Sequence, residues 1–104
     1  MIKVIDGLRY NTETAEEIGS WSNGYYSSDF HHCNETIYRT KNGNYFIYGE
    51  GGALSKWSES FGNSKGEGSG IVALSVKEAL EWFEEKGVEI PETCKEIGDL
   101  VKDA

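Results

Sequence analysis

The chain has 104 residues, a formal net charge of −8 at pH 7 and a hydrophobic share of 38%. A chain of this size builds one core with little area left for a deep cleft, so we expect one domain over residues 1–104 that binds at its surface. The hydrophobic share excludes outright disorder, no stretch has the apolar length of a membrane span, and the negative charge disfavours binding to phosphate backbones.

The N-terminal segment predicts a short hairpin. Asp6-Gly7 stands between two stretches of apolar-polar alternation, which is a turn signal, so strands are expected at about residues 2–5 and 8–10. Charge and a turn interrupt the segment Met1–Asp6 too early for a secretory signal peptide. We therefore expect a cytoplasmic protein.

A helix is predicted after this hairpin. Asn11 suits the N-cap position of a helix that begins at Thr12, and acidic residues in the first turns favour the positive end of the helix dipole. Gly24 is expected to follow its end. Its buried side is predicted to consist of Ala15, Ile18 and Trp21.

A second hairpin is the strongest pattern in the chain. Residues 36–40 and 45–48 are rich in β-branched and aromatic side chains, and they flank Asn42-Gly43. If Asn42-Gly43 forms a two-residue turn, Glu35 and Glu50 lie opposite each other at the open end of the hairpin. These two carboxylates are expected to be solvated.

The segment after the central hairpin predicts a short helix, a loop and a strand. Residues 53–61 carry apolar side chains at helical spacing, and residues 71–74 form an apolar run suited to a buried strand. Residues 62–70 between them hold four glycines and lack a period, so this stretch is expected to be the most mobile loop.

The C-terminal third predicts two helices. Ser75 and Glu78 form a capping box, and Gly87 ends the helix that follows. Pro91 suits the first turn of another helix. The apolar stripe of the first helix is Val76, Ala79, Leu80 and Phe83, and that of the second is Cys94, Ile97 and Val101. The whole pattern predicts an α+β fold, with a small antiparallel β-sheet carrying the central hairpin packed against two to four short helices.

No metal or cofactor site is predicted. His31-His32-Cys33 offers adjacent ligands, but no second ligand pair at zinc spacing follows, and no further histidine occurs. Cys33 and Cys94 are expected to be free thiols, with Cys33 partly buried, because a reducing compartment disfavours one isolated bridge.

No catalytic motif is present either. The chain lacks a Gly-x-Ser-x-Gly elbow, and its only histidines are neighbours, so an enzyme is not expected. The segment Gly49–Gly52 has the outline of a phosphate-binding loop, but Glu50 stands where a lysine would be useful. A small ligand-binding protein that uses this loop is therefore a weaker alternative.

The C-terminal third carries most of the negative charge. Residues 71–104 have a net charge of −5, and Trp82 falls off the apolar stripe, which predicts a partly exposed indole among carboxylates. Such a surface suits a basic protein, because tryptophan offers a flat area and a cation–π face. The predicted partner-binding residues are Glu50, Trp57, Glu78, Glu81, Trp82 and Glu85.

Three segments carry a resemblance to a known group of proteins. The stretches Gly7–Ala15 and Tyr38–Gly52, with the glutamate-rich Ala79–Trp82 after Leu74-Ser75, resemble small proteins carried by phages and conjugative elements of Gram-positive bacteria. Small acidic proteins of these elements include inhibitors of CRISPR and restriction systems. The resemblance implies an anti-CRISPR-type inhibitor that competes with nucleic acid for a basic host effector, and it supplies no catalytic residue. A neutral interaction or regulatory module of a mobile element remains the alternative.

Overall fold

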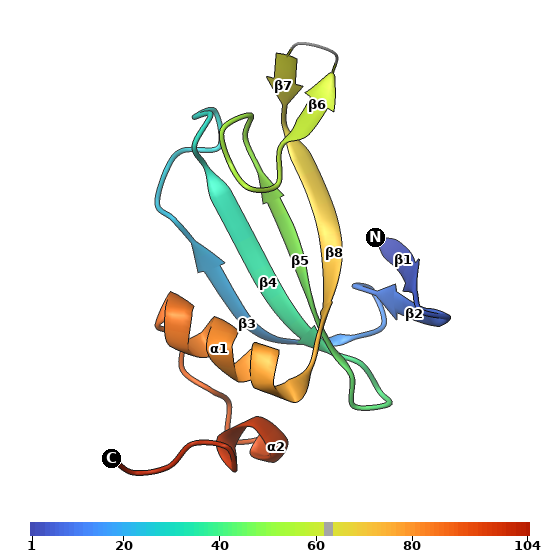
Figure 1. Cartoon of the computed structure of the whole chain (residues 1–104), viewed down its shortest axis with the longest axis vertical. Helices are drawn as coiled ribbons and strands as arrows, with labels where there is room; N and C mark the ends of the chain where they lie inside the picture. The colour runs from blue at the N-terminus through green and yellow to red at the C-terminus, as the bar shows by residue number, and fades with distance from the viewer. Residues whose placement is uncertain (62–63) are drawn as a thin grey trace.

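The computed structural model describes residues 1–61 and 64–104 and shows an α+β fold, which confirms the predicted class (Figure 1). Its centre is a four-stranded antiparallel sheet in the order β3-β4-β5-β8. The helix α1 (Val76–Lys86) crosses one face of this sheet, and the single turn α2 (Lys95–Gly98) lies beside α1 (Figure 1). The strands of the sheet are β3 (Glu16–Ser22), β4 (Cys33–Arg39), β5 (Tyr45–Gly51) and β8 (Gly68–Leu74).

Two small hairpins complete the fold. One pairs β1 (Ile2–Ile5) with β2 (Leu8–Asn11), and the other pairs β6 (Glu59–Phe61) with β7 (Ser64–Gly66). The first hairpin was predicted correctly, and its turn residues Asp6 and Gly7 both have positive φ, at 50° and 79°. Among the described residues, no helix combines the length and apolar composition that crossing a bilayer requires.

The core has one part on each face of the sheet. On the face under α1, buried side chains of the sheet pack against buried side chains of α1 and of the α2 segment. Those of the sheet are Ile18, Ile37, Tyr45 and Ile47, and those of the helical segments are Ala79, Trp82, Phe83, Cys94 and Ile97. On the back face, Tyr10 of β2 packs edge-on against Phe46, which also stacks on Tyr38. The Lys3 ammonium donates to the Ile71 carbonyl, so the first hairpin also shields the outer edge of β8.

The central hairpin exists, but its predicted register is wrong by one residue. Thr40 pairs with Asn44, and the Gly43 amide donates to the Thr40 carbonyl at 3.0 Å, so the loop has three residues. Gly43 adopts a φ of 85° at the left-handed position that such a loop requires. Glu35 consequently faces Gly49, and Glu50 faces Asn34. Because side chains alternate along a strand, Glu35 and Glu50 lie on opposite faces.

The helix predicted from Thr12 is wrong, since residues 16–22 form the edge strand β3. Asn11 caps only a single turn, in which its side chain accepts from the Glu13 amide at 2.9 Å. A bulge between Glu17 and Gly19 inserts one extra residue, and it turns Ile18 to the same face as Trp21. This three-residue spacing imitates the period of a helix.

The helix predicted over residues 53–61 is also wrong. These residues form turns that lead into β6, and Trp57 lies against the sheet. Gly49 and Gly70 are paired neighbours on β5 and β8, and both contact the Trp57 indole. A side chain on Gly49 would occupy the space of the indole ring. The glycines therefore provide a flat surface on which this loop packs.

The predicted mobile loop over residues 62–70 is largely strand. Residues 64–66 form β7 and residues 68–70 begin β8, whereas residues 62–63 lie outside the described residues. The glycine-rich composition of residues 62–70 predicts a flexible segment. In β8 it instead removes side chains from the face on which the Trp57 loop packs.

The helix α1 begins and ends as predicted. Ser75 and Glu78 form the reciprocal capping box, and Gly87 adopts φ 66° at the C-cap. The second helix is shorter than predicted, because α2 spans only four residues. Cys94 and Ile97 are buried, but Val101 is 55% exposed, so its placement in the buried stripe is wrong.

We expect Gly49→Ala to lower the free energy of unfolding by about 1–3 kcal/mol, because the added methyl group displaces the Trp57 indole. Gly98→Ala is the matched control, since nothing lies within 4 Å of the position of its Cβ. Urea denaturation of both variants measures the difference. Equal stability of the two variants would contradict the packing of Trp57 on the glycines.

Candidate functional site

A buried carboxylate lies between the sheet and α1. The Glu35 side chain is 0% exposed and accepts hydrogen bonds from two indole N–H groups, those of Trp57 at 3.0 Å and Trp82 at 2.9 Å. It also forms an ion pair with Lys56 at 2.8 Å and lies 3.8 Å from the ammonium of Lys86. The prediction of a solvated Glu35 is therefore wrong.

The surrounding donors keep Glu35 ionised. Burial acts to raise the pKa of the Glu35 carboxyl, but the hydrogen bonds from Lys56, Trp82 and Trp57 outweigh it and leave the pKa below its ordinary value. The Lys86 ammonium also lies 3.9 Å from the centre of the Trp21 ring. Glu35 thus ties the 53–58 loop and α1 to the sheet.

The Glu35 network forms the inner wall of an open groove, which we call the acidic groove. It lies between the 53–58 loop, the end of β8 and α1, and has a volume of about 400 Å³. Its apolar surface comes from Ile47, Trp57, Val72, Leu74 and Trp82, and its charged rim from Lys56, Glu78, Glu81 and Glu85.

The groove presents a negative rim over an aromatic surface. Glu81 has no ion pair among the described residues, and Glu85 has one with Lys86 at 3.4 Å. Lys56 is the cation of the rim, and its charge is paired with Glu35. The indole N–H groups of both tryptophans are bonded to Glu35. The partly exposed Trp57 indole therefore offers ring surface rather than a polar atom to a ligand.

The structure brings together five of the six predicted partner-binding residues: Trp57, Glu78, Glu81, Trp82 and Glu85. Trp82 is only 6% exposed, so the prediction of a partly exposed indole is wrong. The buried stripe of α1 is rotated from the predicted one and includes Ala79, Trp82, Phe83 and the mostly buried stem of Lys86. This stripe ends at a charged residue, Lys86, so the apolar pattern of the sequence did not predict it.

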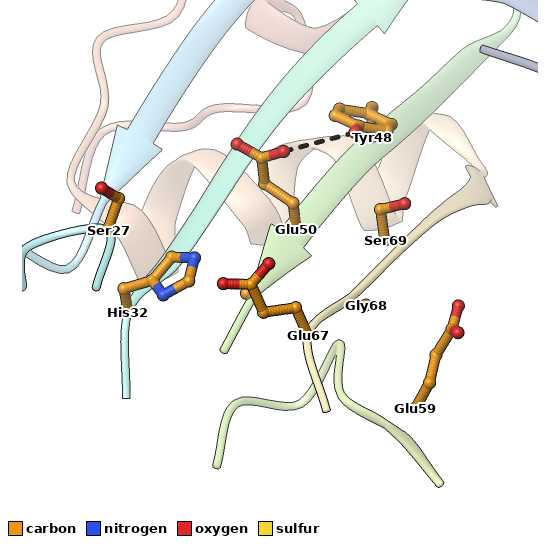
Figure 2. Close-up of a pocket in the computed structure, with 9 residues that line it drawn as sticks. Ser27, His32, Tyr48, Glu50, Glu59, Glu67, Gly68 and Ser69 are labelled. Carbon is orange, nitrogen blue, oxygen red and sulfur yellow. Dashed lines mark hydrogen bonds between the residues drawn. The ribbon is translucent and has the colours of Figure 1, made fainter. Parts of the chain in front are cut away.

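The sixth predicted partner-binding residue, Glu50, lies outside the acidic groove. It lines a polar pocket of about 580 Å³ on the back face, where the Tyr48 hydroxyl donates to it at 3.4 Å (Figure 2). Ser27, His32, Gly51, Glu59, Glu67, Gly68 and Ser69 complete the lining. Within residues 1–61 and 64–104, no three histidine, cysteine or acidic side chains converge as metal ligands.

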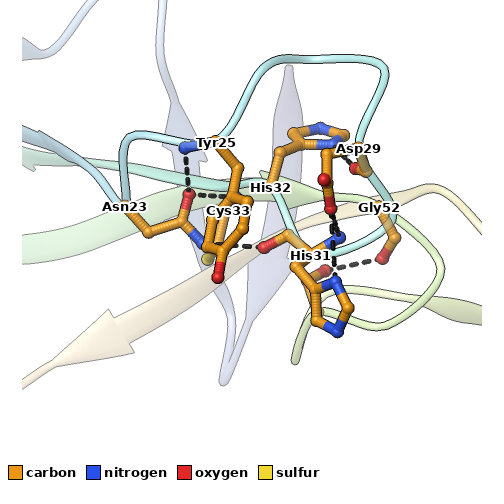
Figure 3. A network of polar contacts seen from close by, with 8 residues as sticks. Asn23, Tyr25, Asp29, His31, His32, Cys33 and Gly52 are labelled. Atoms are coloured by element: carbon orange, nitrogen blue, oxygen red, sulfur yellow. Dashed lines mark hydrogen bonds and ion pairs between the residues drawn. The ribbon is translucent and has the colours of Figure 1, made fainter.

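The His31-His32-Cys33 segment is held by a polar network (Figure 3). Asn23 donates to the His31 carbonyl at 2.7 Å and accepts from the Cys33 amide at 3.1 Å. His31 is exposed and pairs with Asp29, while His32 is buried. Cys33 and Cys94 are free, buried thiols, and burial is the main cause that raises the pKa of Cys33.

No protein-family model, curated protein or solved structure matches this chain. The resemblance to mobile-element proteins therefore stays a prediction. The geometry of the acidic groove and of the polar pocket is the basis for the functional proposals.

We expect Glu35→Gln to lower the free energy of unfolding by about 3–5 kcal/mol, because it leaves the ammonium of Lys86, whose side chain is only 11% exposed, without its buried counter-charge. Glu81→Gln is the control and should change stability by no more than about 0.5 kcal/mol, since its carboxylate is exposed. Urea denaturation at neutral pH compares the two. A smaller loss for Glu35→Gln than for Glu81→Gln would contradict the role of this network.

The depressed pKa of Glu35 also predicts a pH dependence. Its contribution to stability is fully present above the pKa of an unfolded glutamate and is lost as pH falls through the lower pKa of the folded protein. The stability of the wild type should therefore fall more steeply in this acidic range than that of Glu35→Gln. Parallel pH profiles of the two proteins, measured by thermal unfolding, would refute this linkage.

Proposed function

We propose that the protein is an interaction protein that binds a basic partner through the acidic groove. The observation that carries the proposal is the convergence of three α1 carboxylates with two indoles around one groove. A lysine or arginine side chain satisfies both parts of this surface, since its stem packs on the partly exposed Trp57 indole while its charge pairs with the rim. A neutral apolar ligand would leave the carboxylates of the rim without partners.

The partner proposed is a nucleic-acid-binding effector of a host defence system, CRISPR or restriction, in the cytoplasm. Proteins of this class carry basic channels, and the net charge of −8 favours association with such surfaces over association with nucleic acid. The acidic groove would occupy a channel that otherwise holds a phosphate backbone. Inhibition by competition needs no catalytic step, so the proposal includes no enzymatic activity. The resemblance to phage and conjugative-element proteins supports this setting.

A neutral interaction module is the second candidate, and one observation favours it. Tyr26, Phe30 and Leu54 are exposed, and the Leu54 amide donates to the Phe30 carbonyl at 2.8 Å, which brings two of them together. Contact through this apolar patch would be insensitive to charge. Salt dependence therefore distinguishes the two candidates.

We expect binding to a basic effector captured from host lysate after nuclease treatment to be electrostatic. The association rate should fall as added salt shortens the Debye length from about 10 Å at 0.1 M to about 3 Å at 1 M. Glu81→Lys should slow association markedly and weaken competition with the effector's nucleic acid. Surface plasmon resonance and a displacement assay measure these effects.

Glu84→Lys is the matched control, because Glu84 is exposed on the same helix but does not line the groove. It changes the net charge as much as Glu81→Lys does. An association rate that is indifferent to salt and to Glu81→Lys would reject the proposal and favour the neutral module. If Glu81→Lys and Glu84→Lys slowed association equally, the acidic groove would not be the contact surface.

A further inference from the structure

The polar pocket on the back face contains a buried imidazole whose second nitrogen has no partner among the described residues. His32 is 8% exposed, and its Nδ1 lies 2.8 Å from the Asp29 carbonyl oxygen. A carbonyl only accepts, so Nδ1 carries a proton, and Nε2 is an acceptor whenever the ring is neutral. Among the described residues, no hydrogen bond or ion pair involves Nε2. The ring points into the pocket towards Glu50 and Glu67 (Figure 2).

The position of His32 is fixed by its surroundings. Its own carbonyl accepts from the Gly52 amide at 3.0 Å, and the loop before it packs so closely that a side chain at Gly52 would overlap the Phe30 and Asp29 carbonyls (Figure 3). The imidazole is thus held on the pocket wall by its own loop and by the backbone of Gly52, directly after β5. A ligand would meet a preorganised acceptor.

The rest of the pocket consists mainly of further acceptors. The carboxylates of Glu50, Glu59 and Glu67 line it, with the hydroxyl groups of Ser27 and Ser69 between them. The hydroxyl of Tyr48 is already directed at Glu50. Among the described lining residues, none is a lysine or an arginine, and the pocket has a volume of about 580 Å³. The lining is therefore complementary to a ligand that is positively charged and rich in N–H donors.

We propose that this pocket is a second binding site and that it takes a small organic cation with a guanidinium group. A guanidinium offers five N–H donors in one plane, so it bonds to carboxylates and to a neutral imidazole nitrogen at the same time. A metal ion fits less well, because the carboxylates and His32 do not converge as a ligand set. The site lies on the other face of the sheet from the acidic groove and is independent of the partner proposed for it.

Agmatine is the probe, since it carries a guanidinium and an ammonium on a short chain. Isothermal titration calorimetry should detect binding of agmatine to the full chain but not of tetramethylammonium, which has the charge without N–H donors. Glu50→Gln and Glu67→Gln should each weaken agmatine binding at least about tenfold, because each removes a charge-assisted hydrogen bond. His32→Phe should weaken it as well, and circular dichroism verifies that each variant is folded.

Glu84→Gln is the matched control, because Glu84 is exposed on α1 and lines neither the polar pocket nor the acidic groove. The substitution removes one charge of the same sign and should leave agmatine affinity unchanged. Equal weakening by Glu84→Gln and Glu67→Gln would show attraction by net charge alone and would overturn the proposal. So would equal binding of tetramethylammonium, or binding of Mn²⁺ or Zn²⁺ through His32 without binding of agmatine. None of these outcomes bears on the acidic groove, whose partner is tested by Glu81→Lys.

Discussion

The structure depends on the burial of one carboxylate. Removing Glu35 from water costs several kcal/mol, and the fold offsets this cost with two indole N–H groups and two ammonium groups. These donors come from the 53–58 loop and from α1. The carboxylate therefore fixes where both segments lie and how the two tryptophans are oriented. A shift of either segment would leave a buried charge with too few partners.

The same network divides the residues of the acidic groove into two classes. Trp57 and Trp82 form its surface and also bond to Glu35, so their replacement changes stability together with any binding. Glu81 lies on the rim and takes no part in the network, so its replacement separates binding from folding. Stability and the proposed recognition thus share the inner wall of the groove, whereas charge on the rim can vary without loss of stability.

Local signals in the sequence predicted the capped helix, the first hairpin and the existence of the central hairpin, because each depends on a few adjacent residues. Two of the errors, the helix predicted from Thr12 and the register of the central hairpin, depend on one extra residue. The bulge at Ile18 gives an edge strand the spacing of a helix, and Gly43 serves a three-residue loop as readily as a two-residue turn. The wrong register of the central hairpin also affected the prediction for Glu35, because alternate residues of β4 point to opposite faces of the sheet. Composition could not reveal that Gly49 and Gly70 make room for Trp57.

Strand β5 connects the acidic groove with the polar pocket. Gly49 supports the Trp57 indole on the face under α1, and its neighbours Tyr48 and Glu50 line the pocket on the back face. A sheet is one layer of strands thick, so only the backbone of the sheet separates the acidic groove from the polar pocket. The absence of a side chain at Gly49 and the carboxylate at Glu50 are then requirements of two different proposed sites on adjacent residues. The segment Tyr48–Gly52 therefore has no single role in the structure.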